Sequence, residues 1–89
     1  HEARGRGVGT RALRGLAEWV LSTTEVIRLE AYIVVGNEAS ERMTRRAGFQ
    51  REGVLRSWDL LRGAPVDCVA YSRLRSDDPA AGSATGDRP

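Results

Sequence analysis

Three glycines stand within five positions near the start of the chain, in the run Arg4-Gly5-Arg6-Gly7-Val8-Gly9-Thr10. Because each glycine costs a helix about 1 kcal/mol relative to alanine, this run predicts a loop whose backbone approaches a neighbour closely. The residues after it repeat at helical spacing and predict a helix that ends near Ser22, with a buried stripe of Leu13, Leu16, Ala17 and Val20. A glycine-rich loop that opens a helix is typical of an anion site, since free N–H groups and the helix dipole point at the same place.

A strand and a second helix follow. Alternating apolar side chains predict a strand over Val26–Val35. Asn37 is a good N-cap, and Gly48 is suited to the left-handed residue that ends a helix. Between them, one helical face carries Ala39, Met43 and Ala47.

The last ordered part reads as a β-hairpin. Strands are predicted over Phe49–Leu61 and Val66–Leu74, with a turn at residues 62–65 that contains Gly63 and Pro65. The order loop–α–β–α–β–β predicts a single α/β domain over residues 1–75, of the α+β kind with a mixed sheet. Residues 76–89 have almost nothing to bury and predict a disordered tail.

Composition argues against several classes of protein. All 14 basic residues are arginines, and they alternate with 12 acids to give a net charge of only +2, which does not suit a nucleic-acid binder. No apolar run has the length of a membrane span, so no membrane contact is expected. The single cysteine, Cys68, cannot form an intrachain disulfide, which favours the reducing cytoplasm. Without a His/Cys cluster, no metal site is expected, and His1 is given no role.

Two motifs at matching spacing resemble those of a known family. Arg4–Gly9 fits the pattern R/Q-x-x-G-x-G/A, and Gly36–Ser40 (Gly-Asn-Glu-Ala-Ser) is followed by Ala47-Gly48-Phe49. Together they resemble the GCN5-related N-acetyltransferases, and Glu52–Arg56 most resembles the RimJ/RimL branch, which acetylates the N-termini of ribosomal proteins. The likeness covers residues 3–74. It implies the C-terminal half of such a domain, without the strands that precede the glycine run.

The resemblance implies acetyl-coenzyme A as co-substrate and no metal. The backbone N–H groups of residues 6–10 would cradle the pyrophosphate, and two arginine side chains would add charge-assisted hydrogen bonds. The cofactor-binding residues implied are Arg4, Gly5, Arg6, Gly7, Val8, Gly9 and Thr10, with Asn37 contacting the pantetheine arm. The alternatives are a plain glycine loop with solvated arginines, and an Asn37 that only caps its helix.

Catalytic roles also follow from the resemblance. The serine that matches Ser40 is thought to protonate the departing thiolate in the RimJ/RimL branch. Many other acetyltransferases use a tyrosine where this chain has Met43, which leaves Ser40 as the nearby hydroxyl. Asp59 matches a glutamate thought to act as the base, one methylene longer. The alternatives are a serine in a helical first turn and an exposed strand aspartate; Glu30 and Tyr32 are weaker candidates.

The expected activity is transfer of an acetyl group from acetyl-coenzyme A to a primary amine, either a protein N-terminus or a small molecule. A non-catalytic coenzyme A-binding or interaction module is the alternative, and it would need neither Ser40 nor Asp59. In the family, a preceding strand lies beside the strand at residues 26–35. Without that strand we expect an exposed apolar edge, self-association and an inactive chain. Trp19 and Trp58 are expected to pack, with Trp58 also a candidate for the acceptor site.

Overall fold

Two α-helices and three strands make up most of the fold in this computed structural model, which describes residues 2–77 and, from Gly9 onward, their side chains. The elements are α1 (Glu2–Thr23), β1 (Arg28–Val34), α2 (Glu38–Arg46), β2 (Gln50–Leu61) and β3 (Ala64–Leu74), followed by a short 3₁₀-helix (Arg75–Asp77). The α/β class and the order of elements after the glycine run agree with the sequence prediction. Ser76 and Asp77, expected in the tail, belong to the 3₁₀-helix, and the rest of the predicted tail lies outside the described residues.

The sheet has the order β1-β3-β2, with β3 antiparallel to both neighbours. β1 and β2 are therefore parallel to each other and joined by α2, which crosses over β3. The predicted hairpin between β2 and β3 is confirmed, with a tighter turn than expected. Leu61 pairs with Ala64, so only Arg62 and Gly63 form the turn, both at positive φ (53° and 82°). This is the two-residue turn that fits the twist of antiparallel strands.

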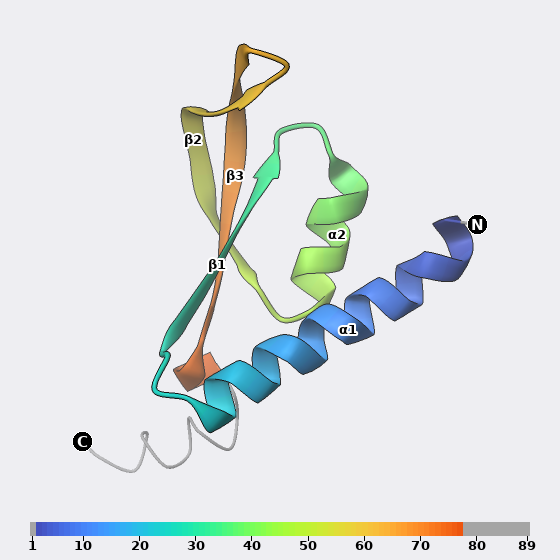
Figure 1. The fold of residues 1–89 in the computed structure, drawn as a ribbon, viewed down its shortest axis with the longest axis vertical. Helices are drawn as coiled ribbons and strands as arrows, with labels where there is room; N and C mark the ends of the chain where they lie inside the picture. Colours follow the sequence, from blue (N-terminus) through green and yellow to red (C-terminus); the bar gives the residue numbers. More distant parts are fainter. Residues whose placement is uncertain (1, 78–89) are drawn as a thin grey trace.

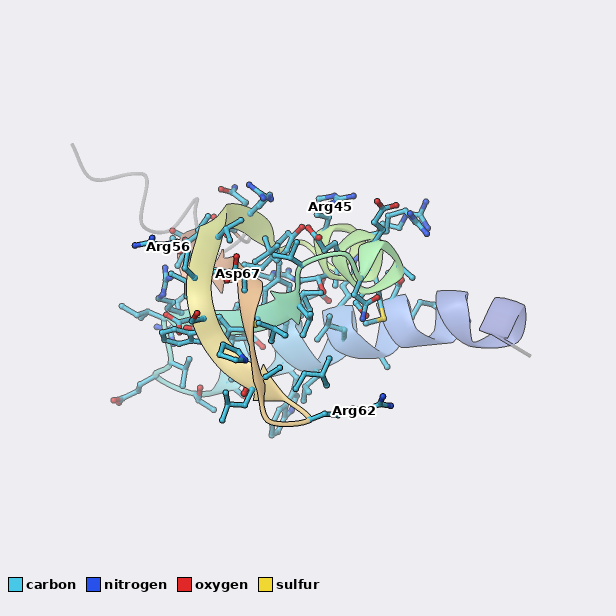
Figure 2. The ribbon with its side chains drawn as sticks, turned by 90° about the horizontal axis from the view of Figure 1, so that it is seen from above. Arg45, Arg56, Arg62 and Asp67 are labelled. Carbon is cyan, nitrogen blue, oxygen red and sulfur yellow. The ribbon has the colours of Figure 1, made fainter. Side chains whose placement is uncertain are left out.

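Both helices lie beside the same face of the sheet, with α2 between β1 and the N-terminal half of α1 (Figure 1). The core lies where these layers meet and consists of Ala17, Ala47, Phe49, Val69 and Tyr71, supported by Leu13, Leu29, Ala31 and Ile33. The opposite face has no helix against it in the described part of the chain. Figure 2 shows Arg45 on α2 and Arg56 on the far side of the sheet, pointing away from the helices.

The start of α1 corrects the sequence prediction. No loop is present over Arg4–Thr10, because α1 begins at Glu2 and runs through the glycines. Once a helix is nucleated, each added residue contributes one hydrogen bond. The cost of about 1 kcal/mol per glycine weakens this growth without stopping it, and the run contains no proline, which would cost about 3 kcal/mol.

The buried stripe of α1 also differs from the prediction. Leu16 is 59% exposed, whereas Leu21, which was not assigned to the stripe, is 3% exposed. The buried face repeats every four residues through Leu13, Ala17 and Leu21. Trp19 does not pack as expected, since it is 61% exposed. Within residues 2–77, neither helix has the length and hydropathy needed to cross a membrane.

Candidate functional site

The N-terminus of α2 has the geometry that the sequence predicted. Asn37 is the N-cap, and its Oδ1 accepts a hydrogen bond from the backbone N–H of Ser40 at 3.2 Å. Glu38 and Glu41 place carboxylates in the first turn, where the helix dipole favours negative charge. Because the cap uses Oδ1, the Asn37 amide NH₂ stays available as a donor, and Asn37 is exposed.

Ser40 lies in the first turn of α2 and is half-buried. Its carbonyl accepts a hydrogen bond from Thr44 Oγ1 at 2.8 Å, while its own Oγ makes no hydrogen bond among the described side chains. Thr44 is therefore a second hydroxyl near the site, which sequence reasoning missed. Thr44 is 1% exposed and its proton is committed to the helix backbone. Of the two hydroxyls, that of Ser40 is the one without a hydrogen bond among the described side chains.

Helix α1 approaches α2 at Gly9. A Cβ placed on Gly9 would stand 3.0 Å from the Met43 sulfur, a distance that real Cβ atoms hardly ever show. Glycine at this position therefore permits the close approach of the two helices. This contact places Gly9 beside Met43, which follows Ser40 by three residues, or about one helical turn, on α2.

The backbone of Arg4–Thr10 lies within α1, and the side chains of Arg4, Arg6 and Val8 lie outside the described ones. A helix that begins at Glu2 uses the N–H groups of residues 6–10 for its own i→i−4 hydrogen bonds. Only the N–H groups of the first turn then stay free for an anion. The predicted cradle therefore requires α1 to begin later than it does in this structure.

Asp59 lies on β2, beside an irregular stretch of the strand. The register between β2 and β3 shifts between Leu55 and Asp59, and Ser57 adopts a positive φ of 49°. The backbone N–H of Ser57 donates to Asp67 Oδ1 at 2.8 Å, which holds the bulge in place. Figure 2 shows Asp67 on β3, inside the bend of β2. Asp59 itself is exposed and accepts a hydrogen bond from the N–H of Leu60.

Asp59 and Asp67 also act on a buried thiol. Burial raises the pKa of Cys68, and the nearby charges of Asp59 and Asp67 raise it further. Cys68 is 2% exposed and lies on the middle strand β3. No hydrogen bond or ion pair joins Asp59 to α2 within the described residues. The structure thus brings Gly9 and the first half of α2 together, and it keeps Asp59 with the sheet.

Glu30 and Tyr32, the two weaker catalytic candidates, are hydrogen-bonded to each other on the open face of the sheet, the face without a helix against it in the described part of the chain. The Tyr32 hydroxyl donates to Glu30, and this bond, with Arg28 as the second cause, holds the pKa of the Glu30 carboxyl below its usual range. The same bond raises the pKa of Tyr32. Tyr32 also packs against Trp58 with ring centroids 5.1 Å apart, so Trp58 packs as predicted while staying 52% exposed.

A buried polar group under α2 was not anticipated. The Tyr71 hydroxyl donates to Glu41 at 2.6 Å and accepts from Arg45 at 3.0 Å. Burial and the bond to Glu41 raise the pKa of Tyr71. The sequence signal was the i,i+4 spacing of Glu41 and Arg45, but nothing in the pattern placed β3 beneath them. Among the described side chains, no group of His, Cys, Asp or Glu is arranged to hold a metal ion.

These features define an antiparallel sheet in which α2 connects β1 to β2 across β3, and a capped helix N-terminus beside the N-terminal half of another helix. The family model for the acetyltransferase (GNAT) domain matches residues 1–50. The chain belongs to this family. It is 33% identical over 69 residues to the uncharacterized N-acetyltransferase YoaA of Bacillus subtilis, covering 78% of this chain and 39% of that protein.

Two solved structures share the fold. The ribosomal-protein-S5-alanine acetyltransferase from Vibrio fischeri superposes with a TM-score of 0.77 at 26% identity, covering 85% of this chain and 42% of that one. RimL, a ribosomal L7/L12 α-N-protein acetyltransferase solved in complex with coenzyme A, superposes with a TM-score of 0.73 at 27% identity, covering 83% of this chain and 42% of that one. The chain thus spans about two fifths of the length of these relatives.

Proposed function

We propose that this chain forms the coenzyme A-binding part of an enzyme that transfers an acetyl group from acetyl-coenzyme A to a primary amine. Family membership supports acetyl transfer in general, and RimL was solved with coenzyme A. The names of the structural relatives favour an acceptor of the protein N-terminal kind. The proposal extends to the cytoplasm as location, where the single thiol Cys68 stays reduced.

The observation that carries this proposal is the meeting of α1 and α2. A Cβ on Gly9 would stand 3.0 Å from the Met43 sulfur, so α1 and α2 approach closely there. Asn37 caps α2 through Oδ1, and neither its NH₂ group nor the Ser40 hydroxyl has a partner among the described side chains. The close approach of α1 to α2 is thus combined with an amide donor and a hydroxyl, and the glycine run would offer its N–H groups to a pyrophosphate when α1 begins after it. An exposed edge of β1 ends beside the start of α2 (Figure 1).

The chain's own residues would divide the work of the reaction. Acetyl-coenzyme A supplies an activated thioester. Asp59, directly or through a water, would take the proton that the ammonium group of the acceptor must lose before its nitrogen can attack. As the new N–C bond forms and the C–S bond breaks, the nitrogen would lose its second proton to solvent. Ser40 would give its proton to the leaving thiolate and recover one from solvent. The Asn37 amide would hold the pantetheine arm.

The glycine run is tested by two matched substitutions in the protein extended to the length of its relatives. Gly7→Asp should abolish binding of acetyl-coenzyme A in calorimetry, because a carboxylate would crowd and repel the pyrophosphate. Gly15→Asp makes the same change at an open position of α1, where a Cβ meets nothing within 4 Å, and should leave binding unchanged. Equal binding by wild type and Gly7→Asp would contradict the assignment of the run.

The alternative is a coenzyme A-binding module without catalysis. The hydrogen bonds of Asp59 and the fixed bulge beside it fit a structural role as well as a chemical one. This alternative predicts that the extended protein binds acetyl-coenzyme A and releases no coenzyme A thiol with any amine. A continuous thiol assay with a peptide that begins with alanine distinguishes the two functions.

A further inference from the structure

Two side-chain contacts cross the middle strand on the open face of the sheet. Arg28 on β1 donates to both carboxylate oxygens of Glu52 on β2, at 3.2 and 2.7 Å. Tyr32 on β1 packs against Trp58 on β2, with centroids 5.1 Å apart. β3 lies between these strands, so both contacts span it. They frame a patch, here called the open-face patch, made of Arg28, Glu30, Tyr32, Glu52 and Trp58.

The open-face patch carries more negative than positive charge. Glu30 and Glu52 share a single guanidinium, that of Arg28, which leaves a formal charge of −1. Hydrogen bonds hold the pKa of both carboxyl groups below the usual range; the largest cause is Tyr32 for Glu30 and Arg28 for Glu52. Both groups are therefore ionised at neutral pH. Their side chains are 42% and 40% exposed, so a second cation can reach them.

Aromatic rings flank the same patch. Tyr32 is 41% and Trp58 52% exposed, and their faces can attract a cation. Trp58 lies in the irregular stretch of β2 between Leu55 and Asp59, next to Ser57 with its positive φ. Between the two rings the sheet carries only small residues, since Ala70 is opposite Tyr32 on β3 and Gly53 is opposite Ala70 on β2. A Cβ on Gly53 would meet nothing within 4 Å.

We propose that the open-face patch binds the protonated primary amine of the acceptor, with the apolar part of that acceptor against Tyr32 and Trp58. The inference rests on the proposed function and adds the residues that select the acceptor. The charge of the patch favours this occupant, because its two carboxylates outnumber its one guanidinium and attract an ammonium group more than a phosphate or a carboxylate. Asp59, the proposed base, belongs to the same strand as Trp58.

The binding step is tested by a titration of the extended protein labelled with ¹⁵N in its tryptophans. The probe is n-butylammonium chloride at constant ionic strength, and 1-butanol is its uncharged counterpart. The indole N–H signal of Trp58, assigned with a Trp58→Phe variant, should shift and saturate with n-butylammonium only. Trp19, exposed on α1, is the internal control and should not move. Equal shifts with both probes, or none, would overturn the proposal.

Two variants test whether the negative charge of the open-face patch binds the cation. Glu30→Gln should weaken n-butylammonium binding at least threefold, whereas Glu38→Gln, the same change at an exposed position of α2, should leave it unchanged. With a peptide that begins with alanine as acceptor, Glu30→Gln should raise KM for the peptide and leave kcat and the KM for acetyl-coenzyme A unchanged. An unchanged KM for the peptide would show that the open-face patch does not bind the acceptor. A saturable indole shift without any acetyl transfer would refute the proposed function and keep the cation site.

Discussion

Single residues of the Ala47-Gly48-Phe49 motif have structural roles that its resemblance to a family motif does not reveal. Ala47 is fully buried, and its carbonyl accepts a hydrogen bond from Arg73 Nη1 at 2.7 Å. Gly48 has a φ of +97°, and a Cβ there would stand 3.1 Å from the Arg73 guanidinium. The motif thus ends α2 and leaves room for a buried arginine. Gly48 was predicted as the left-handed residue, and this is confirmed.

Arg73 should contribute to stability through that contact. Arg73→Met leaves the buried carbonyl of Ala47 without its donor and should lower the free energy of unfolding by roughly 1–3 kcal/mol, measured by urea denaturation. Glu18, the ionic partner of Arg73 at 3.4 Å, is half exposed, so Glu18→Gln should cost less than about 1 kcal/mol. Equal losses in the two variants would contradict the role given to the carbonyl contact.

Ser40 gives the sharpest test of chemistry at a single residue. In the extended protein, Ser40→Ala should lower kcat more than it raises KM for acetyl-coenzyme A, because a proton donor acts in the transition state. General acids contribute on the order of 10²–10⁴-fold. Thr44→Val, which removes the buried hydroxyl next to it, should lower stability and leave kcat largely intact. A loss of kcat below about threefold in Ser40→Ala would mean that Ser40 only forms part of the first turn of α2 and does not donate the proton.

At the scale of elements, the sequence predicted most of what local patterns control. The strands, the N-cap at Asn37 and the hairpin all depend on neighbours close in sequence. The predicted start of α1 was wrong, because the free-energy cost of glycine in a helix is smaller than the gain from extending a helix that has already formed. The choice between Leu16 and Leu21 as the buried residue depends on how α1 meets the sheet and α2, which no local pattern contains. The open-face patch likewise depends on strand order, which brings β1 and β2 to either side of β3.

Asn37 allows the helix cap and the ligand contact to be separated. Asn37→Ala removes the acceptor of the Ser40 N–H bond and should destabilise the fold by about 1 kcal/mol. Asn37→Asp keeps that acceptor and should retain stability, but it loses the amide NH₂ donor. We expect Asn37→Asp to weaken acetyl-coenzyme A binding in calorimetry while its thermal unfolding matches wild type. If Asn37→Asp binds as tightly as wild type, Asn37 is a cap only.

At the scale of the whole molecule, helices cover only one face of the sheet in the described part of the chain (Figure 1). Within residues 2–77, β1 pairs with β3 alone, so its other edge has no partner. Val35 N–H donates to the Asp67 carbonyl at 3.0 Å. Along an antiparallel strand, the backbone N–H groups point alternately toward the paired strand and away from it. The N–H of Val34 therefore points to the free edge of β1. An exposed edge of this kind pairs readily with another chain.

The isolated 89-residue chain should therefore self-associate through β1 and fail to acetylate amines, since it spans about two fifths of the length of its relatives. Val34→Pro removes the edge N–H without breaking a bond to β3, so it should shift the light-scattering mass toward the monomer. Val34→Ala shortens the same side chain and keeps the N–H, so it should stay associated. Neither variant should gain activity, because positioning of the thioester needs both sides of its cleft. A monomeric wild-type chain that turns over acetyl-coenzyme A would refute both expectations at once.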